Sequence, residues 1–215
     1  MVPFFAELVT ETDEARRAFE THPVVLDAVG NGMPLERYRR LLLELYHIVW
    51  HFNPVCAAAA SRVADGQRPV RYFLYAHMQE ESGHEEWVLN DLQAIGMARE
   101  SAMTSVAGPF TSALCGYNYW SADRRHPCSV LGMVYALEVI ASVYGGPFAS
   151  AIRESLLLEG DLGVSFISSH ATMDAQHMAE LRTLLNTVED PSARSSIVES
   201  ATLNFHHFTR IFEAI

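Results

Sequence analysis

Histidine and acidic side chains recur at helical spacing inside apolar stretches of this 215-residue sequence. Glu81 and His84 are three residues apart, and a later segment carries His170, Asp174 and His177. Intervals of three, four and seven residues place side chains on one face of a helix. Carboxylates and imidazoles grouped in this way are typical ligands of metal ions such as iron and manganese. We therefore ask whether these segments build a metal site.

Glu138 is difficult to explain as an ordinary core residue. It is the only charged residue of the apolar stretch 130–143. Burying an unpaired carboxylate costs several kcal/mol unless its pKa rises or a cation meets it. The sequence contains no lysine, so a positive partner must be an arginine or a metal ion. The remaining alternative is that this helix face is exposed to solvent.

Glu44 begins a repeated order of ligand types along the chain. It shares a helix face with His47 and His51 in another largely apolar stretch. A single carboxylate is followed by a carboxylate-x-x-His unit, and this order occurs twice. The first occurrence is Glu44 with Glu81-x-x-His84, and the second is Glu138 with Asp174-x-x-His177. A dinuclear metal site in a helical bundle needs this set of ligands. Oxygen and nitrogen donors without thiolates favour iron or manganese, with zinc as a further possibility.

Each of these features also has an ordinary structural explanation. A single Glu-x-x-His pair is common on helix surfaces, and His47 and His51 could be core histidines bonded to backbone carbonyls. We expect Glu80, Glu85 and Glu86 to form a solvated acidic face. The joint occurrence of the four segments is what favours the metal site.

The composition limits the partners and the compartment. The 15 basic residues are all arginines and face 26 acidic residues, which gives a net charge of −11. A nucleic-acid-binding protein or one bound to an anionic membrane needs a basic surface, so we expect neither partner. The apolar stretch 130–148 is interrupted by Glu138 and by Gly-Gly-Pro, which is too broken for a membrane span. The acidic N-terminus is unlike a signal peptide, and the odd set of Cys56, Cys115 and Cys128 indicates a reducing cytoplasm.

The hydrophobic periodicity predicts helices almost everywhere and no sheet. We expect one all-α domain, residues 1–215, folded as a bundle of long helices joined by shorter ones. The predicted helices are Thr12–Glu20, Pro23–Val29, Leu35–Ala64, Pro69–Ile95, Phe110–Ala122, Cys128–Tyr144, Pro147–Leu158, Val164–Val188 and Pro191–Ile215.

The ligand pattern from Glu44 to His177 resembles the heme-oxygenase-like diiron oxidases and oxygenases, which include the chlamydial protein associated with death domains. The resemblance implies a heme-oxygenase-like helical bundle with two iron ions (or manganese) and O2 as co-substrate. It also implies the metal ligands Glu44, Glu81, His84, Glu138, His170, Asp174 and His177. Such sites commonly use six ligands, so one of the seven is expected to lie outside the first coordination sphere. The pattern leaves open whether His47, His51 or His77 replaces Glu44.

The same resemblance implies an O2-dependent oxidoreductase acting on a small metabolite. An amino-acid-like amine or a fatty-acid-like carboxylate would undergo N-oxygenation, desaturation or C–C cleavage. Candidate anchors for a substrate carboxylate are Arg39, Arg153 and Arg182. Candidate residues that orient the ligands are Tyr46, Tyr135 and Gln176. We expect a homodimer, the commonest assembly of soluble enzymes.

Four alternatives remain. Heme oxygenase proper needs an early axial histidine, for which His22 is the only candidate. A TenA-like thiaminase-type hydrolase would use a cysteine nucleophile, for which Cys128 is the candidate. A ferritin-like bundle would also hold two iron ions, and a non-catalytic interaction module would hold none. Metal analysis separates the diiron predictions from the hydrolase and the interaction module.

Overall fold

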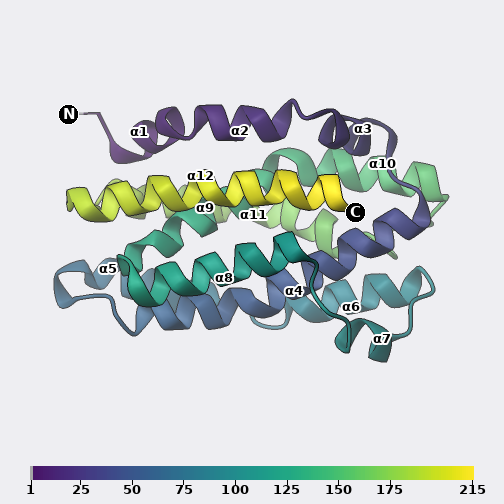
Figure 1. Cartoon of the computed structure of the whole chain (residues 1–215), viewed down its shortest axis with the longest axis horizontal. Helices are drawn as coiled ribbons and strands as arrows, with labels where there is room; N and C mark the ends of the chain where they lie inside the picture. The colour runs from purple at the N-terminus through teal and green to yellow at the C-terminus, as the bar shows by residue number, and fades with distance from the viewer. Residues whose placement is uncertain (1) are drawn as a thin grey trace.

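The computed structural model describes residues 2–215, apart from the side chains of Asp174 and Ala175. The longer helices run roughly along one axis, and the two ends of the chain lie at opposite ends of the bundle (Figure 1). The described residues include no strand. The predicted all-α bundle is therefore confirmed.

The helical elements follow one another with short connections. In chain order they are α1 (Phe4–Glu11), α2 (Asp13–Glu20), α3 (Pro23–Asn31), α4 (Leu35–Ala60), the 3-10 turn η1 (Asp65–Gln67), α5 (Arg68–Glu80), α6 (His84–Ala94), α7 (Arg99–Met103), α8 (Pro109–Arg124), the 3-10 turn η2 (Pro127–Ser129), α9 (Val130–Ile140), the π-helical segment η3 (Ala141–Gly145), α10 (Gly146–Leu156), α11 (Ser165–Leu185) and α12 (Pro191–Ala214).

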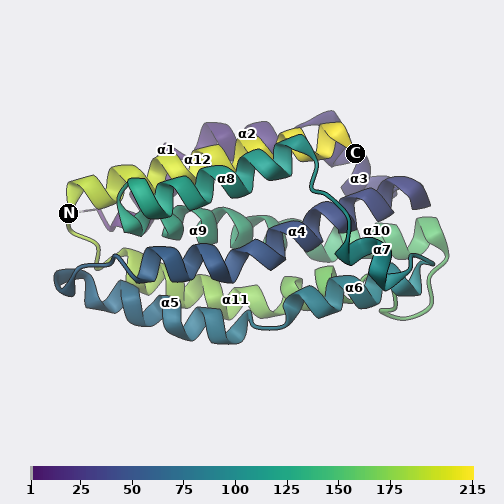
Figure 2. The same cartoon turned by 60° about the horizontal axis from the view of Figure 1, so that its bottom comes forward.

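The helix predicted over 69–95 is two helices in the structure. α5 ends at Glu80, and α6 begins at His84 after a turn. Gly83 in this turn has a φ of 95°, a left-handed conformation that a residue with a side chain adopts at a cost. The two helices lie end to end along one side of the bundle (Figure 2). The helical interruption therefore falls inside the Glu81-x-x-His84 unit.

α12 and α9 pack very closely in the middle of the bundle. A Cβ atom added to Gly132 on α9 would lie 2.2 Å from the backbone oxygen of Ile197 on α12. Only glycine allows the two backbones to approach to this distance without a shift. This contact fixes the height of α9, and therefore of Glu138, relative to its neighbours.

The buried apolar side chains form two clusters. One includes the second half of α4, α5 and the start of α12, and the other includes the first half of α4, α6 and the end of α12. Leu137 and Ile140 on α9 pack against both clusters. Glu138 therefore enters the interior at the boundary between the two.

One stretch of the described chain, Pro127–Leu156, is long and apolar enough to span a membrane by length and composition. Its most apolar 18-residue window has a mean hydropathy of 1.6, and 67% of that window is buried within the bundle. It comprises η2, α9, η3 and α10, whose buried side chains contribute to both apolar clusters. Apolar composition of this kind is what a central core helix requires.

Candidate metal centre

The turn between α5 and α6 positions Glu81 and His84. The backbone N–H of Glu81 donates to the carbonyl of His77, which continues the hydrogen bonding of α5 by one residue. After the turn at Gly83, His84 starts α6 with its ring directed back toward Glu81. Its Nδ1 lies 2.8 Å from Glu81 Oε2. The pair predicted from helical spacing is therefore brought together by a turn.

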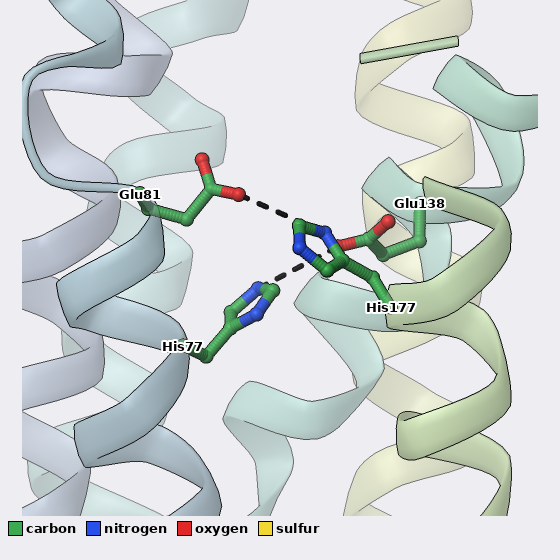
Figure 3. Close-up of side chains that lie close together, drawn as sticks. All are labelled: His77, Glu81, Glu138 and His177. Atoms are coloured by element: carbon green, nitrogen blue, oxygen red, sulfur yellow. Dashed lines mark ion pairs between the residues drawn. The ribbon is translucent and has the colours of Figure 1, made fainter. Parts of the chain in front are cut away.

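A first group of four side chains converges from α5, the turn after it, α9 and α11 (Figure 3). Glu138 Oε1 lies 3.2 Å from His177 Nδ1 and 3.5 Å from His77 Nε2. Glu81 Oε1 completes the group at 3.9 Å from His177 Nδ1. Each member offers one atom that could bind a metal ion, and these four atoms lie within 4.8 Å of one another. One metal ion could therefore bind all four, and we call such a set a donor group.

A second group adjoins the first and shares Glu81 with it. His170 Nε2 lies 3.2 Å from His84 Nδ1 and 3.6 Å from Glu81 Oε2. The other nitrogen of His170, Nδ1, lies 2.9 Å from the carbonyl oxygen of Phe166 and donates to it when it carries the proton. That hydrogen bond favours the tautomer in which the Nε2 lone pair of His170 faces Glu81 and His84.

The electrostatics keep both groups in forms that can bind a cation. Burial alone would raise the pKa of Glu81, but the adjoining imidazoles of His170 and His84 outweigh it and hold this pKa well below its usual value. Burial lowers the pKa of His77, although Glu138 and Glu81 oppose the shift. Glu81 is therefore a carboxylate, and His77 is a neutral imidazole with a lone pair, at neutral pH.

A buried carboxylate on α6 fixes the start of the helix that carries His170 and His177. Asp91 accepts hydrogen bonds from the backbone N–H groups of Ser165 and Phe166 at 2.9 and 2.8 Å. These are the first residues of α11, whose N–H groups have no partner within the helix. Asp91 thereby ties the position of α11 to that of α6, which carries His84.

The helix that carries Glu138 widens directly after it. Ala141–Gly145 forms a π-helical segment, and the hydroxyl of Ser142 donates to the carbonyl of Glu138 at 2.6 Å. Gly145 in this segment faces α11, where an added Cβ would lie 3.3 Å from the backbone of Ile167. Short π-helical segments inside helices occur frequently at functional sites.

Of the predicted ligands, the structure brings together Glu81, His84, Glu138, His170 and His177. The side chain of Asp174 lies outside the described residues. His77, which the sequence left open as a replacement for Glu44, lies in the first group. It comes from α5, one turn before Glu81.

Glu44 lies apart from both groups. Its two carboxylate oxygens accept from the backbone N–H of Gly108 at 3.1 and 3.0 Å. His47 and His51, on the same side of α4, bond to the hydroxyls of Ser105 and Tyr119. The opposite side of the helix, which is apolar, faces the interior cavity described below. The predicted face therefore exists, but it is turned toward α8 and the loop before it.

The residues predicted to orient the ligands also lie elsewhere. Tyr46 packs beside Trp50, and Gln176 donates to Glu180. Tyr135 packs edge-on against aromatic rings of the core. The groups that do contact the candidate ligands include the Phe166 carbonyl, the Trp87 ring stacked 4.1 Å from His84, and Glu80. Sequence patterns gave no signal for the Phe166 carbonyl, because every residue has a backbone carbonyl and the residue type does not show which one bonds to a ligand.

An apolar cavity of about 140 Å³ adjoins both groups. Its lining residues include Glu138 from the first group, His170 from the second, and the shared Glu81. The rest of the lining is apolar apart from Tyr144, and it includes no lysine, arginine or cysteine. The lining is Phe19, Val25, Val29, Leu41, Leu45, Ile48, Val49, Phe52, Glu81, Leu137, Glu138, Ile140, Ala141, Tyr144, Gly145, Phe148, Phe166, Ile167, His170, Phe208 and Phe212.

The profile of the iron-containing redox enzyme family matches residues 39–206 of the sequence, which span both donor groups. The chain belongs to this family. A comparison with curated proteins finds no match. Membership supports an oxidoreductase, without specifying the cofactor form or the substrate.

Solved structures similar to this iron-containing redox enzyme share the heme oxygenase-like fold. A domain of unknown function from Shewanella denitrificans has a TM-score of 0.82 at 24% identity, covering 97% of this chain and 88% of that one. A TenA homologue from Pseudomonas syringae has a TM-score of 0.82 at 15% identity, covering 98% and 91%. Heme oxygenase-1 from Synechocystis, in complex with heme, has a TM-score of 0.77 at 14% identity, covering 99% and 92%. At these identities the likeness establishes the fold alone.

The donor groups fit the iron that the family description implies. Glu138 Oε2 and His77 Nε2 are buried and make no hydrogen bond. Buried polar atoms of this kind are costly, and a bound cation would satisfy them. Imidazole nitrogens and carboxylate oxygens without thiolates are the donors that non-heme iron uses.

Proposed function

We propose that this chain is an O2-dependent non-heme diiron oxidoreductase that oxidises a small molecule with an apolar body. The observation that carries the proposal is the pair of donor groups that share Glu81 and open onto one apolar cavity. Two metal ions held about 4 Å apart by a common carboxylate are a recurring arrangement in two-metal enzymes.

The members of the two donor groups are the residues that would hold the ions. His77, Glu138 and His177 would bind one, His84 and His170 the other, and Glu81 would bridge them. Asp174 remains a sequence-based candidate for a further ligand. Bound iron would supply the one-electron redox chemistry that lets O2 react with an organic substrate.

The protein itself would contribute charge, orientation and a dry environment. The carboxylates of Glu81 and Glu138 offset part of the positive charge of the metal ions. The Phe166 carbonyl fixes the ring of His170, and Trp87 stacks on His84. The apolar lining of the cavity excludes water from the side of the centre where a substrate bond would be oriented.

The cavity favours an apolar substrate over an amino acid. An amino acid would bring two charged groups into the cavity, and beyond the donor groups its lining offers them no arginine and only the hydroxyl of Tyr144. Arg153 pairs with Asp161 at 2.6 Å, Arg39 bonds to the carbonyl of Ile95, and Arg182 lies over the Phe5 ring. An apolar cavity of about 150 Å³ holds a hydrocarbon ring. We therefore propose a substrate with a ring-sized or short-chain apolar body and one polar head directed at the metal ions.

The residues that the heme and thiaminase-type alternatives require do not line the cavity. His22, the candidate axial ligand for heme, pairs with Glu213 at 3.1 Å and is absent from the lining. Cys128, the candidate thiaminase-type nucleophile, is fully buried, and burial raises its pKa to about 12. The fold alone is compatible with both alternatives, so the metal content must decide.

The test of the metal centre is anaerobic reconstitution with Fe(II) followed by metal analysis and Mössbauer spectroscopy. We expect two iron ions per chain, magnetically coupled after exposure to O2. His177→Ala should lose this coupled signal, while His206→Ala, at an exposed position on α12, should keep it. One isolated iron, no iron, or stoichiometric heme binding in its place would refute the diiron proposal.

The test of the substrate class is O2 consumption by the iron-loaded protein with matched compounds. Short-chain fatty acids and phenyl-substituted acids should stimulate consumption, and amino acids of the same length should not. Val49→Trp fills the cavity from α4, a helix that carries no member of either donor group, and should reduce stimulation while leaving the iron content unchanged. Equal stimulation by charged amino acids would refute the apolar substrate class but leave the diiron centre standing.

A further inference from the structure

Glu80 lies just outside the first donor group and faces both of its histidines. Its Oε2 is 3.5 Å from His177 Nε2 and 3.9 Å from His77 Nδ1. The side chain is 43% exposed, whereas the two histidine side chains are almost fully buried. The carboxylate therefore lies at the solvent edge of the group, with one imidazole on each side of it.

Glu80 faces the nitrogen of each ring that points away from Glu138. In His177, Nδ1 faces Glu138 and Nε2 faces Glu80. In His77 the order is reversed, so that Nε2 faces Glu138 and Nδ1 faces Glu80. The nitrogen that faces Glu138 is therefore Nδ1 in His177 and Nε2 in His77. We call it the inner nitrogen of each ring, and Glu80 is next to the other, outer nitrogen of both rings. Figure 3 shows the His177 ring between Glu81 and Glu138, with the His77 ring below it.

A neutral imidazole carries one N–H and one lone pair, and only the lone pair binds a metal. For His77 and His177 to bind one ion together, both outer nitrogens must hold the proton. A carboxylate next to those nitrogens stabilises the required tautomers and raises the basicity of the inner nitrogens. The distances of 3.5 and 3.9 Å need only a small movement of the exposed Glu80 side chain to become hydrogen bonds.

A solvated acidic face, which the sequence predicts for Glu80, Glu85 and Glu86, explains the position of Glu86 better than that of Glu80. Glu86 forms an ion pair with Arg99, as a surface carboxylate is expected to do. The ion pairs of Glu80 within the described residues are both with candidate metal ligands. Its position thus follows from the metal centre, and an ordinary surface role gives no reason for it.

We propose that Glu80 is a positioning residue that holds His77 and His177 in the tautomers required to bind one metal ion. This inference rests on the proposed function, in which both histidines are metal ligands. Groups that orient histidine ligands in this way typically contribute 10- to 100-fold to metal affinity.

The experiment measures Zn²⁺ binding and the imidazole N–H signals of the zinc-loaded protein, without using activity. Glu80→Ala removes the carboxylate, and Glu80→Asp keeps the charge but shortens the side chain. Glu180→Gln is the control for charge, because Glu180 is exposed, lies three residues after His177, and bonds to Gln176. Circular dichroism of each variant checks that the fold is kept, as the exposure of Glu80 leads us to expect.

We expect Glu80→Ala to weaken Zn²⁺ binding about 10- to 100-fold and Glu180→Gln to leave it unchanged. The wild type should show N–H protons on His77 Nδ1 and His177 Nε2 that exchange slowly with water. Both should exchange rapidly in Glu80→Ala. Glu80→Asp should bind almost as weakly as Glu80→Ala.

Three results would overturn the inference, and they are distinguishable. If Glu80→Ala keeps the wild-type affinity and slow N–H signals, Glu80 has no positioning role and the proposed metal centre stands. If Glu80→Asp binds like the wild type while Glu80→Ala does not, the charge acts without positioning. If the wild type binds no Zn²⁺ through His77 and His177, the proposed metal centre fails and the inference fails with it.

Discussion

Two regions of the molecule carry the same residue types at the same helical spacing and yet differ in how their polar atoms are satisfied. On α4, Glu44 and its two histidine neighbours each bond to an ordinary protein group. At the centre formed by α5, α6, α9 and α11, the donor atoms face one another. Glu138 Oε2 is buried there without a hydrogen bond.

The difference teaches that residue type and spacing do not by themselves identify a metal site. Acidic and histidine side chains on a half-buried helix face are stable when loops and hydroxyls supply partners, as Ser105 and Tyr119 do on α4. Where buried atoms such as Glu138 Oε2 and His77 Nε2 make no hydrogen bond, the arrangement is costly unless a cation is bound. The convergence of donor atoms distinguishes the two regions.

The largest expected effect is on metal content. Glu81 belongs to both donor groups, so Glu81→Ala should abolish binding of both iron ions. Glu44→Ala should keep both, because its carboxylate bonds to Gly108 instead. Iron analysis of the two reconstituted variants, with the wild type beside them, measures the contrast. Loss of iron in Glu44→Ala would erase the distinction between the two regions.

The second prediction concerns the stability of the metal-free protein. Glu138→Leu removes a buried carboxylate oxygen that makes no hydrogen bond, although the Oε1 contacts with His77 and His177 are lost as well, so it should raise the free energy of unfolding by about 1 kcal/mol. Urea unfolding with chelator present measures this change. Added iron should stabilise the wild type and leave Glu138→Leu with much less stabilisation. A metal-free variant less stable than the wild type would show that Glu138 contributes to folding.

The third prediction is that removing a carboxylate from α4 lowers the free energy of unfolding, whereas removing Glu138 raises it. Glu44 accepts from Gly108, the residue that caps the start of α8. Glu44→Ala should therefore lower the free energy of unfolding by about 1 kcal/mol, since the bond is charged but only half-buried. Glu36→Ala, on the exposed start of the same helix, is the matched control and should change it by less than about 0.5 kcal/mol. Equal effects of the two substitutions would argue against the capping role.

The smallest expected effect is on the thiols, which distinguishes a metal enzyme from a cysteine hydrolase. Burial raises the pKa of Cys115 to about 11 and that of Cys128 to about 12. Because only the thiolate reacts, the folded protein should react negligibly with iodoacetamide at pH 8 and faster only as the pH approaches 11. The urea-unfolded protein is the positive control. Rapid labelling of Cys128 in the folded state would revive the hydrolase alternative.

The sequence was sufficient for the helical architecture and for the choice of most candidate ligands. The apolar stretch around Glu138 left an arginine partner, a metal ion or an exposed helix face as the explanations for its carboxylate, and the three- and four-residue spacings placed His170 and His177 on one helix face. Both inferences depend on local geometry, which a helix fixes within a few residues. Glu80 and His77 lie in the same segment as Glu81 and His84, but their spacing did not distinguish them from surface and core residues.

Other features depended on contacts between segments distant in the sequence. The turn at Gly83 breaks the predicted helix, and Asp91 caps α11 from another helix. The π-helical segment after Glu138 has no sequence signature that periodicity detects. None of these three follows from the hydrophobic pattern, because each depends on backbone detail or on a long-range hydrogen bond.

By itself, the amino-acid order determined that this chain forms amphipathic helices bearing acids and histidines on defined faces. Only the tertiary structure decided which of those faces meet. α4 directs Leu41, Leu45 and Ile48 toward the cavity, and so turns Glu44 toward Gly108. The physical reason is that helical periodicity sets the angle between residues of one helix. The rotation of that helix about its own axis is set by the packing of its larger apolar face against its neighbours.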